Sequence, residues 1–231
     1  MTYDAQGSWN RLYAESTAMA WPAEGVIRIL KGRFPGLAMP SPTAGQRILD
    51  VGCGDGRHLP LFQSIGLESS ACEISDEIVD KLRKRLREMG LESDVRTGHA
   101  GNLPFGDGEF DYLLTWNSCY YMSLTGPNFP AHVEEMARVI KPGGWIICSI
   151  PKKTSFIFDA SLPHEVPGYR VIADDFFGAR NGEVMRCMSS RQDLVESFAP
   201  QFDGFCHADL DMQWFGLAYH WHVFCARRIA A

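Results

Sequence analysis

Apolar and polar residues follow two different spacings along the first 150 positions of this chain. Short apolar runs, typical of buried strands, cover positions 47–51, 69–73, 94–98, 110–115 and 145–150. Between these runs, apolar residues recur every three or four positions, as on one face of an amphipathic helix. Strands that alternate with helices in this way favour a parallel sheet with helices packed on its two faces. We therefore expect an α/β fold.

Two of the predicted helices have recognisable ends. Ser75 stands where a hydroxyl can cap the first free backbone N–H groups, and Gly90 stands where a left-handed residue ends a helix. Asn128 is the expected cap of a later helix, which the turn at 141–144 breaks. The stripe that we expect to be buried on the first of these helices consists of Ile78, Val79, Leu82, Leu86 and Met89.

The two ends of the chain add further elements. Pro22 opens a predicted amphipathic helix that packs across the sheet. Its apolar face consists of Ala23, Val26, Ile27, Leu30 and Phe34. The segment 151–190 has little periodicity and many turn formers, so we expect a long irregular excursion there. A short helix over 191–198 and strands over 203–211 and 217–226 close the chain.

One stretch carries the most information about function. Asp50 ends the first apolar run, and Gly52, Gly54 and Gly56 follow at alternate positions before a helical pattern begins. A strand, tight turn and helix of this kind bring bare backbone against a ligand. The dinucleotide fingerprint Gly-x-Gly-x-x-Gly would need a third glycine at position 57, which is Arg57. The pattern Asp-x-Gly-x-Gly-x-Gly instead resembles the first motif of class I S-adenosylmethionine (SAM)-dependent methyltransferases.

Further stretches strengthen this resemblance. Residues 99–105, His-Ala-Gly-Asn-Leu-Pro-Phe, are similar to the family segment Gly-Asp-Ala-x-x-Leu-Pro-Phe, with His99 in place of the acid. The strand at 110–115 has an acidic residue near its start, and 139–144 looks like the family's helix-to-strand turn. The resemblance covers 47–150 and, more loosely, the C-terminal end. It implies a doubly wound, seven-stranded, mostly parallel sheet with an antiparallel C-terminal hairpin, the Rossmann-like methyltransferase fold.

Pattern and resemblance together predict a single methyltransferase domain over 1–231. Within it we expect an N-terminal helical cap at 1–46, a SAM-binding core at 47–150, a substrate-recognition insertion at 151–190, and a C-terminal helix and hairpin at 191–231. A chain of 231 residues is large enough for one domain with a substantial core.

Glu73 is a candidate ligand of the cofactor ribose. It ends the second predicted strand, seventeen residues past Gly56, where a doubly wound fold places an acidic side chain against ribose hydroxyls. A carboxylate can accept hydrogen bonds from both hydroxyls of a diol. The alternative is an exposed glutamate at a strand end, but its place after the glycine turn favours the functional interpretation.

The resemblance extends the cofactor site beyond Glu73. The cofactor-binding residues that it implies are Asp50, Gly52, Cys53, Gly54, Gly56, Glu73, Ile74, His99, Ala100, Leu103, Thr115 and Trp116. Asp50 and the glycines would hold the methionine moiety, and His99 with Ala100 would contact adenine. A neutral imidazole at position 99 can accept one hydrogen bond or stack on the base, but it offers no carboxylate.

Aromatic residues indicate where an acceptor substrate would bind. Those predicted to line its pocket are Trp9, Tyr13, Tyr120 and Tyr121, with the alternative that each is a core residue. The two tyrosines follow a strand end, where ligands of open α/β sheets bind. An aromatic face also attracts a sulfonium group by about 0.5–2 kcal/mol. As proton acceptors we name Tyr121, His164 and His220.

Metal chemistry has little support in the sequence. His220 and His222 share one face of the last predicted strand, a spacing compatible with metal ligation. No Asp, Glu or Cys at ligand spacing accompanies them, so we expect no metal site.

Composition limits the partners and the compartment. The formal net charge of −6 argues against general nucleic-acid binding, because phosphate contacts depend on an excess of Lys and Arg. The seven cysteines form no Cys-x-x-Cys pair, which fits reduced thiols. No apolar run approaches the roughly 20 residues of a membrane span. We expect a cytoplasmic protein with no membrane partner.

The resemblance implies transfer of the SAM sulfonium methyl group to an O, N, S or C nucleophile of a small-molecule metabolite, with S-adenosylhomocysteine (SAH) as product. Two alternatives remain open at this point. One is a SAM-binding protein without transferase activity, such as a regulator or a partner subunit, which the histidine at position 99 favours. The other is an NAD(P)-dependent oxidoreductase, which the glycine spacing and the lack of a Tyr-x-x-x-Lys pair disfavour.

Overall fold

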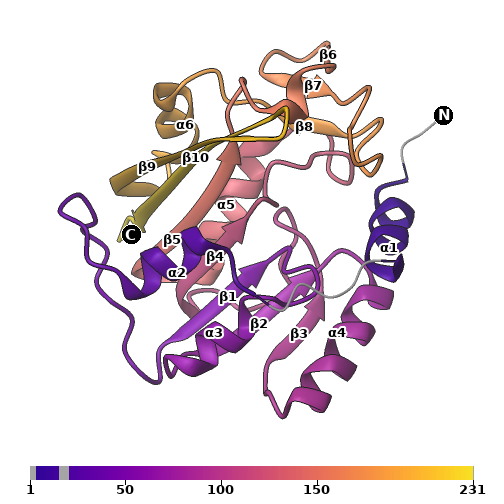
Figure 1. Cartoon of the computed structure of the whole chain (residues 1–231). Helices are drawn as coiled ribbons and strands as arrows, with labels where there is room; N and C mark the ends of the chain where they lie inside the picture. The colour runs from indigo at the N-terminus through magenta and orange to yellow at the C-terminus, as the bar shows by residue number, and fades with distance from the viewer. Residues whose placement is uncertain (1–3, 16–20, 231) are drawn as a thin grey trace.

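A seven-stranded sheet forms the centre of the computed structural model, which describes residues 4–15 and 21–230 (Figure 1). The strand order is β3-β2-β1-β4-β5-β10-β9. The strands are β1 (Arg47–Val51), β2 (Glu68–Glu73), β3 (Asp94–Thr97), β4 (Phe110–Trp116), β5 (Ile140–Pro151), β9 (Phe202–Trp214) and β10 (Leu217–Arg228). Neighbours from β3 to β5 are parallel, whereas β10 is antiparallel to both β5 and β9. The predicted doubly wound sheet and its C-terminal hairpin are confirmed.

Helices cover both faces of this sheet. Besides α1 (Ala5–Glu15), the helices are α2 (Glu24–Lys31), α3 (Leu59–Ser64), α4 (Asp76–Met89), α5 (Phe129–Val139) and α6 (Arg191–Phe198). Buried side chains of α2, α3 and α4 share one hydrophobic cluster, and those of α5 and α6 share the other. The sheet therefore has a core on each face, as its nearly continuous apolar strands require. No helix in the described ranges is both long and apolar enough to cross a membrane.

The two ends of α4 lie where the sequence predicts them, but one side chain in its last turn is more exposed than predicted. The Ser75 hydroxyl accepts from the Ile78 N–H, and Gly90 takes the left-handed conformation at φ 66°. Met89, predicted to be buried, is 47% exposed, because it lies in the final turn at the end of the buried stripe. The four other residues of the predicted stripe are buried.

Two other helix predictions need correction. Asn128 does not cap α5 with its side chain; the Phe129 N–H at the helix start donates instead to the Tyr169 hydroxyl at 2.8 Å. Helix α2 has 8 residues and ends at Lys31, so Phe34 lies outside it and is 46% exposed. Val26 and Leu30 are the side chains that α2 buries.

The segment 151–190 is more regular than its sequence predicts. It contains a 3₁₀ turn, η1 (Phe156–Phe158), and a small antiparallel sheet of β6 (Leu162–Pro163), β7 (Tyr169–Val171) and β8 (Val184–Arg186). These strands have two or three residues, too few to show a period of two in the sequence.

Backbone bonds hold this small sheet against the chain that follows β4. The Met122 N–H donates to the Val184 carbonyl at 2.8 Å, and the Arg186 N–H donates to the Tyr120 carbonyl at 2.9 Å. Figure 1 shows the small sheet at the top of the molecule, with α1 to its right. The segment is thereby fixed next to the carboxyl end of a central strand.

Candidate functional site

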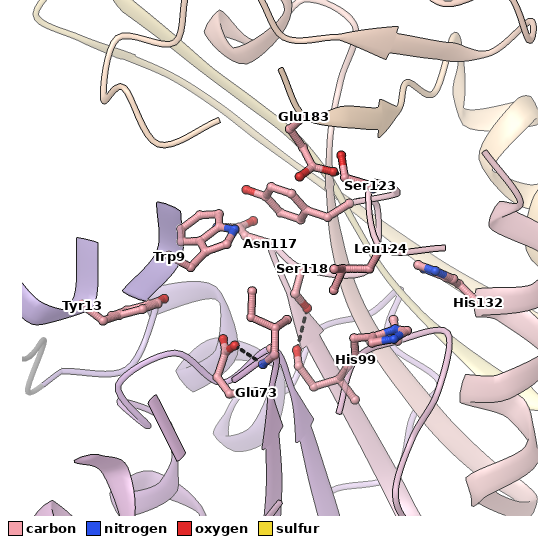
Figure 2. A pocket seen from close by; sticks show the side chains of 15 residues that line it. Trp9, Tyr13, Glu73, His99, Asn117, Ser118, Ser123, Leu124, His132 and Glu183 are labelled. Carbon is pink, nitrogen blue, oxygen red and sulfur yellow. Dashed lines mark hydrogen bonds between the residues drawn. The ribbon is translucent and has the colours of Figure 1, made fainter. Parts of the chain in front are cut away.

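A pocket opens where β1, β2 and β4 end, between α1 and the segment 151–190 (Figure 2). The residues that line it are Trp9, Tyr13, Val51, Gly52, Glu73, Ile74, His99, Ala100, Asn117, Ser118, Tyr121, Ser123, Leu124, His132 and Glu183. Its position at the carboxyl ends of parallel strands, beside the point where strand order reverses, is where open α/β sheets bind ligands.

The glycine turn forms the floor of this region. Gly52, Gly54 and Gly56 all have positive φ angles, a conformation that glycine adopts without steric cost. A Cβ atom on Gly54 would lie 2.3 Å from the Tyr13 hydroxyl, and one on Gly56 would lie 2.5 Å from a methyl group of Leu82. Gly54 therefore allows the close approach of Tyr13, which lines the pocket, whereas Gly56 allows the turn to pack on α4.

Asp50 supports the turn from below. Its side chain is 1% exposed, and its Oδ2 lies 3.0 Å from Nδ1 of His58 at the start of α3. Asp50 does not line the pocket, and Cys53, which is also buried, points into the core beneath the turn. The structure thus places these two predicted cofactor ligands behind the backbone that faces the cavity.

Glu73 joins the turn to the second strand. The Gly54 N–H donates to its Oε1 at 3.1 Å. The Ile74 N–H donates to its Oε2 at 2.5 Å, a bond that Figure 2 shows. Burial raises the pKa of this carboxyl group to about 7, although both backbone bonds favour the ionised form. Each oxygen keeps a further lone pair for a donor in the pocket.

His99 and Ala100 form another wall, close to His132 on α5. The Gly101 N–H donates to Nδ1 of His99 at 3.2 Å, so the ring proton of the neutral imidazole is on Nε2. Burial lowers the pKa of His99, which keeps the ring neutral near pH 7. Because its one acceptor nitrogen is already engaged, His99 can offer the pocket a donor, which corrects the expectation that it would accept.

Aromatic and charged residues form the roof. Trp9 on α1 meets Tyr121 edge to face, with ring centroids 5.5 Å apart. Nε of Arg180 donates to the Tyr121 hydroxyl at 3.0 Å, and Nη1 of Arg180 pairs with Asp175 at 2.8 Å. These bonds lie across the cavity from Glu73, so α1 and the segment 151–190 close the same pocket.

Glu183 is a pocket residue that the sequence analysis missed. It is 1% exposed and lies just before β8, with its Oε1 accepting from the N–H groups of Met122 at 3.1 Å and Ser123 at 2.9 Å. No local motif marks it, since the segment around it has no periodicity. Only the docking of β8 on the chain after β4 brings it to the cavity.

Four other predicted residues lie outside the pocket. Trp116 packs on α2, where a Cβ on Gly25 would lie 2.4 Å from its ring, so it is on the opposite face of the sheet from the pocket. Leu103 is a core residue, and Thr115 shapes the turn by its hydrogen bond with Ser118. Tyr120 is buried behind Tyr121, with the two rings stacked at 4.9 Å. These positions correct the predicted contacts of their side chains with cofactor or substrate.

The histidines proposed as proton acceptors also lie elsewhere. His164 accepts from the Val166 N–H between β6 and β7, and His220 on β10 bonds Thr154 at 3.0 Å. Neither lines the pocket, whereas Tyr121 does. His222 lies 3.5 Å from Asp209, and no group of three or more metal-ligating side chains occurs in the described part of the chain.

The donor set of the pocket fits SAM. Glu73 offers carboxylate oxygens for a ribose diol, and the backbone of Gly52 lines the same pocket. Trp9 and Tyr121 provide aromatic faces for a sulfonium. A doubly wound fold with such a pocket is the class of protein that the geometry indicates.

Comparisons with known proteins identify the family. Residues 48–144 match a methyltransferase domain. The chain is 32% identical over 110 residues to a ubiquinone biosynthesis O-methyltransferase of Thiobacillus denitrificans, covering 47% of this chain and 46% of that protein. It is 29% identical over 168 residues to a fatty-acid O-methyltransferase of Mycolicibacterium smegmatis, covering 69% and 56%. The chain thus spans about half the length of these curated relatives.

Solved structures share the fold. A SAM-dependent methyltransferase of Methanosarcina mazei superposes with a TM-score of 0.65 at 20% identity, over 82% of this chain and 95% of that one. A putative methyltransferase from Haloferax volcanii, solved with the Trm112 activator, gives 0.67 at 15% identity, over 100% and 99%. Together these similarities support the assignment of the chain to the class I SAM-dependent methyltransferases, whose fold it shares.

Proposed function

We propose that this protein transfers the methyl group of SAM to a nucleophile of a small-molecule substrate. The observation that carries the proposal is the buried Glu73 carboxylate, which backbone bonds fix to the glycine turn while it faces a cavity. Family membership supplies the expected cofactor, and the names of the curated relatives support a small-molecule acceptor.

In this proposal, different residues of the pocket contact different parts of the cofactor. Glu73 accepts from the ribose hydroxyls, the backbone at Gly52 and Gly54 lies against the amino-acid moiety, and His99 with Ala100 contacts the base. The bound cofactor supplies an activated methyl group on sulfur with a neutral thioether as leaving group. The protein therefore needs mainly to align the acceptor and exclude water.

The acceptor would bind on the side of Trp9, Tyr121 and Ser123. This side is enclosed by α1 and by the segment 151–190, so it suits a small molecule better than a nucleic acid strand. The net charge of −6 also favours a small molecule over a nucleic acid. No feature of the described pocket favours either the non-catalytic SAM-binding protein or the NAD(P)-dependent oxidoreductase.

A calorimetric titration tests the proposal. We expect SAH to bind the purified protein with a micromolar dissociation constant and NADH, the control nucleotide, to give no heat of binding. Binding of NADH without SAH would overturn the cofactor assignment. Turnover is then checked with tritiated methyl-SAM and a panel of hydroxyl, amine and thiol acceptors, with tritium extracted into the acceptor as the expected result.

We also propose that the protein works in a reducing compartment such as the cytoplasm. All seven cysteines are free, and six of them are buried. Free thiols in this number suit an environment that keeps cysteines reduced.

A further inference from the structure

Glu183 has the geometry of a fixed acceptor. Its Oε1 is bound by two consecutive backbone N–H groups, those of Met122 and Ser123. Its own backbone is fixed as well, because its N–H donates to the Arg180 carbonyl and its carbonyl accepts from the Ile172 N–H. The carboxylate cannot swing away without breaking these bonds, so its second oxygen has a defined position.

This carboxylate also faces the cavity. Figure 2 shows it beside Ser123 at the top of the pocket, on the side where Trp9 lies and opposite Glu73. The two buried glutamates thus occupy opposite walls: Glu73 belongs to the cofactor wall at the end of β2, and Glu183 belongs to the acceptor wall.

No cation neutralises Glu183 among the described residues. Arg180 and Arg186 are each three residues from Glu183, but Arg180 pairs with Asp175 through Nη1 and donates to the Tyr121 hydroxyl through Nε, and Arg186 pairs with Asp193. A structural carboxylate at 1% exposure is usually paired, because an unpaired buried charge is costly. A buried carboxylate that has no ion-pair partner and faces a cavity is typical of a functional site.

We propose that Glu183 is the general base that removes a proton from the acceptor substrate. This inference rests on the proposed methyltransferase function and names its acceptor class, an oxygen or nitrogen nucleophile that carries a proton. The proton passes to Oε2 of the Glu183 carboxylate, and the electron pair it leaves forms the new bond to carbon. The electron pair of the broken carbon–sulfur bond stays on sulfur, and Glu183 later releases the proton to solvent.

The charged surroundings of Glu183 determine its dependence on pH. The groups that act on it are Tyr121 and the Ser123 hydroxyl, both from the chain after β4, while Arg180 from the segment before β8 acts on Tyr121 and pairs with Asp175. Burial raises the pKa of Tyr121, so this phenol stays neutral around pH 7, and Arg180 stays protonated. Burial also raises the pKa of Glu183 to about 7, so the basic form increases as pH rises through neutrality.

The titration of Glu183 can be measured without knowing the acceptor. The protein is labelled with ¹³C at the glutamate δ-carbon, and NMR spectra are recorded from pH 5 to 9. The resonance missing from Glu183→Gln is assigned to Glu183, and Glu196→Gln on the exposed face of α6 is the matched control. We expect a midpoint near pH 7; a carboxylate already ionised at pH 5, or still protonated at pH 9, would overturn the proposal.

Its position toward the reacting centre is tested with sinefungin, a SAM analogue with an amine in place of the methyl-bearing sulfonium. Calorimetry at pH 8 compares sinefungin with SAH for the wild type, Glu183→Gln and Glu196→Gln. If Glu183 faces the amine, Glu183→Gln weakens sinefungin by about tenfold and changes SAH less than about twofold. Glu183→Asp, which retains the charge, is measured as well in case the amide variant does not fold.

The outcomes separate the two proposals. Equal loss or equal retention of both ligands in Glu183→Gln would reject Glu183 as the base while leaving the cofactor site intact. A wild-type protein that binds neither SAH nor sinefungin would reject the methyltransferase function, and the general-base role would fail with it.

Discussion

At the scale of single residues, the pocket depends on positions that tolerate few amino-acid substitutions. Gly54 combines a φ of 58° with a Cβ direction blocked at 2.3 Å by the Tyr13 hydroxyl. The Gly54 N–H is also one of the two donors that hold Glu73. Gly54 therefore determines the backbone conformation of the turn, the close approach of Tyr13 and the anchoring of the Glu73 carboxylate.

Replacing this glycine tests the floor of the pocket. We expect Gly54→Val to weaken SAH binding by at least about tenfold, because a β-branched residue is strained at positive φ and its side chain collides with Tyr13 of the pocket lining. Gly36→Val is the matched control, since Gly36 is exposed and a Cβ there meets no atom within 4 Å. Isothermal calorimetry measures both, and equal affinities for SAH would contradict the predicted role.

A second substitution removes the proposed ribose acceptor. Glu73→Ala should weaken SAH binding by at least about tenfold, because the diol loses its acceptor and the N–H groups of Gly54 and Ile74 lose their partner. Glu68→Ala, at the exposed start of the same strand, should bind SAH like the wild type. An unchanged dissociation constant in Glu73→Ala would remove Glu73 from the site.

His132 links the pocket to acid stability. Its Nδ1 bonds the Cys119 carbonyl at 2.9 Å, and burial lowers its pKa to about 4. The unfolded chain, with an ordinary histidine pKa near 6.5, takes up the proton first as pH falls. The contribution of neutral His132 is therefore complete above pH 6.5 and is lost between pH 6.5 and 4, with about 2 kcal/mol lost by pH 5.

The predicted loss of stability as pH falls can be checked by thermal unfolding. His132→Asn keeps a donor for the Cys119 carbonyl but cannot be charged, so its Tm should fall less than that of the wild type between pH 7.5 and 5. The buried carboxyl groups of Glu73 and Glu183 have raised pKa values and shift stability in the opposite sense, but they do so equally in both proteins. The same Tm decrease in wild type and variant would refute the assignment to His132.

At the scale of elements, α1 behaves as a cover built onto the pocket. The Ser75 hydroxyl donates to Oδ1 of Asn10 at 2.6 Å, and the amide of Gln6 donates to the Ile74 carbonyl at 2.8 Å. Trp9 and Tyr13 extend from this helix to Tyr121 and Gly54. Both aromatics line the pocket, as the sequence predicts, while their contact with substrate stays a prediction.

Limited proteolysis tests the role of α1. A ligand that fills the pocket gains contacts with α1 and stabilises its folded form, so SAH should slow tryptic cleavage after Arg11 by at least about threefold. Arg33, exposed beyond α2, provides the internal control and should be cleaved at the same rate with and without SAH. Equal protection at both sites would mean general stabilisation and would contradict a specific cover.

At the scale of the whole molecule, two halves of different character meet at one pocket. The sheet and its glycine turn provide the cofactor wall, built from β1, β2 and the residues after β3. The segment 151–190, attached by backbone bonds to the chain after β4, contributes Glu183 to the proposed acceptor wall. A rigid α/β scaffold with a separate segment over its strand ends allows specificity to vary while the cofactor site is retained.

The sequence by itself determined the elements whose signals are local. The period of the apolar residues predicted the strands of the main sheet, and Ser75 with Gly90 predicted both ends of α4, because caps depend on neighbours within one turn. The glycine spacing and Glu73 pointed to the cofactor wall for the same reason. Trp116 shows the limit, since a single strand residue has no local signal that tells which face of a sheet covers it.

Only the tertiary structure decided what lies opposite that wall. Glu183 is 62 residues beyond Tyr121 in the sequence, and the pairing of β8 with the chain after β4 is what brings them into one cavity. In the sequence, His164 and His220 were equally suitable as candidate bases, but neither lines the pocket in the structure. Chemical type can be read along a chain, whereas proximity between distant segments is set by packing and by backbone hydrogen bonds that no short motif encodes.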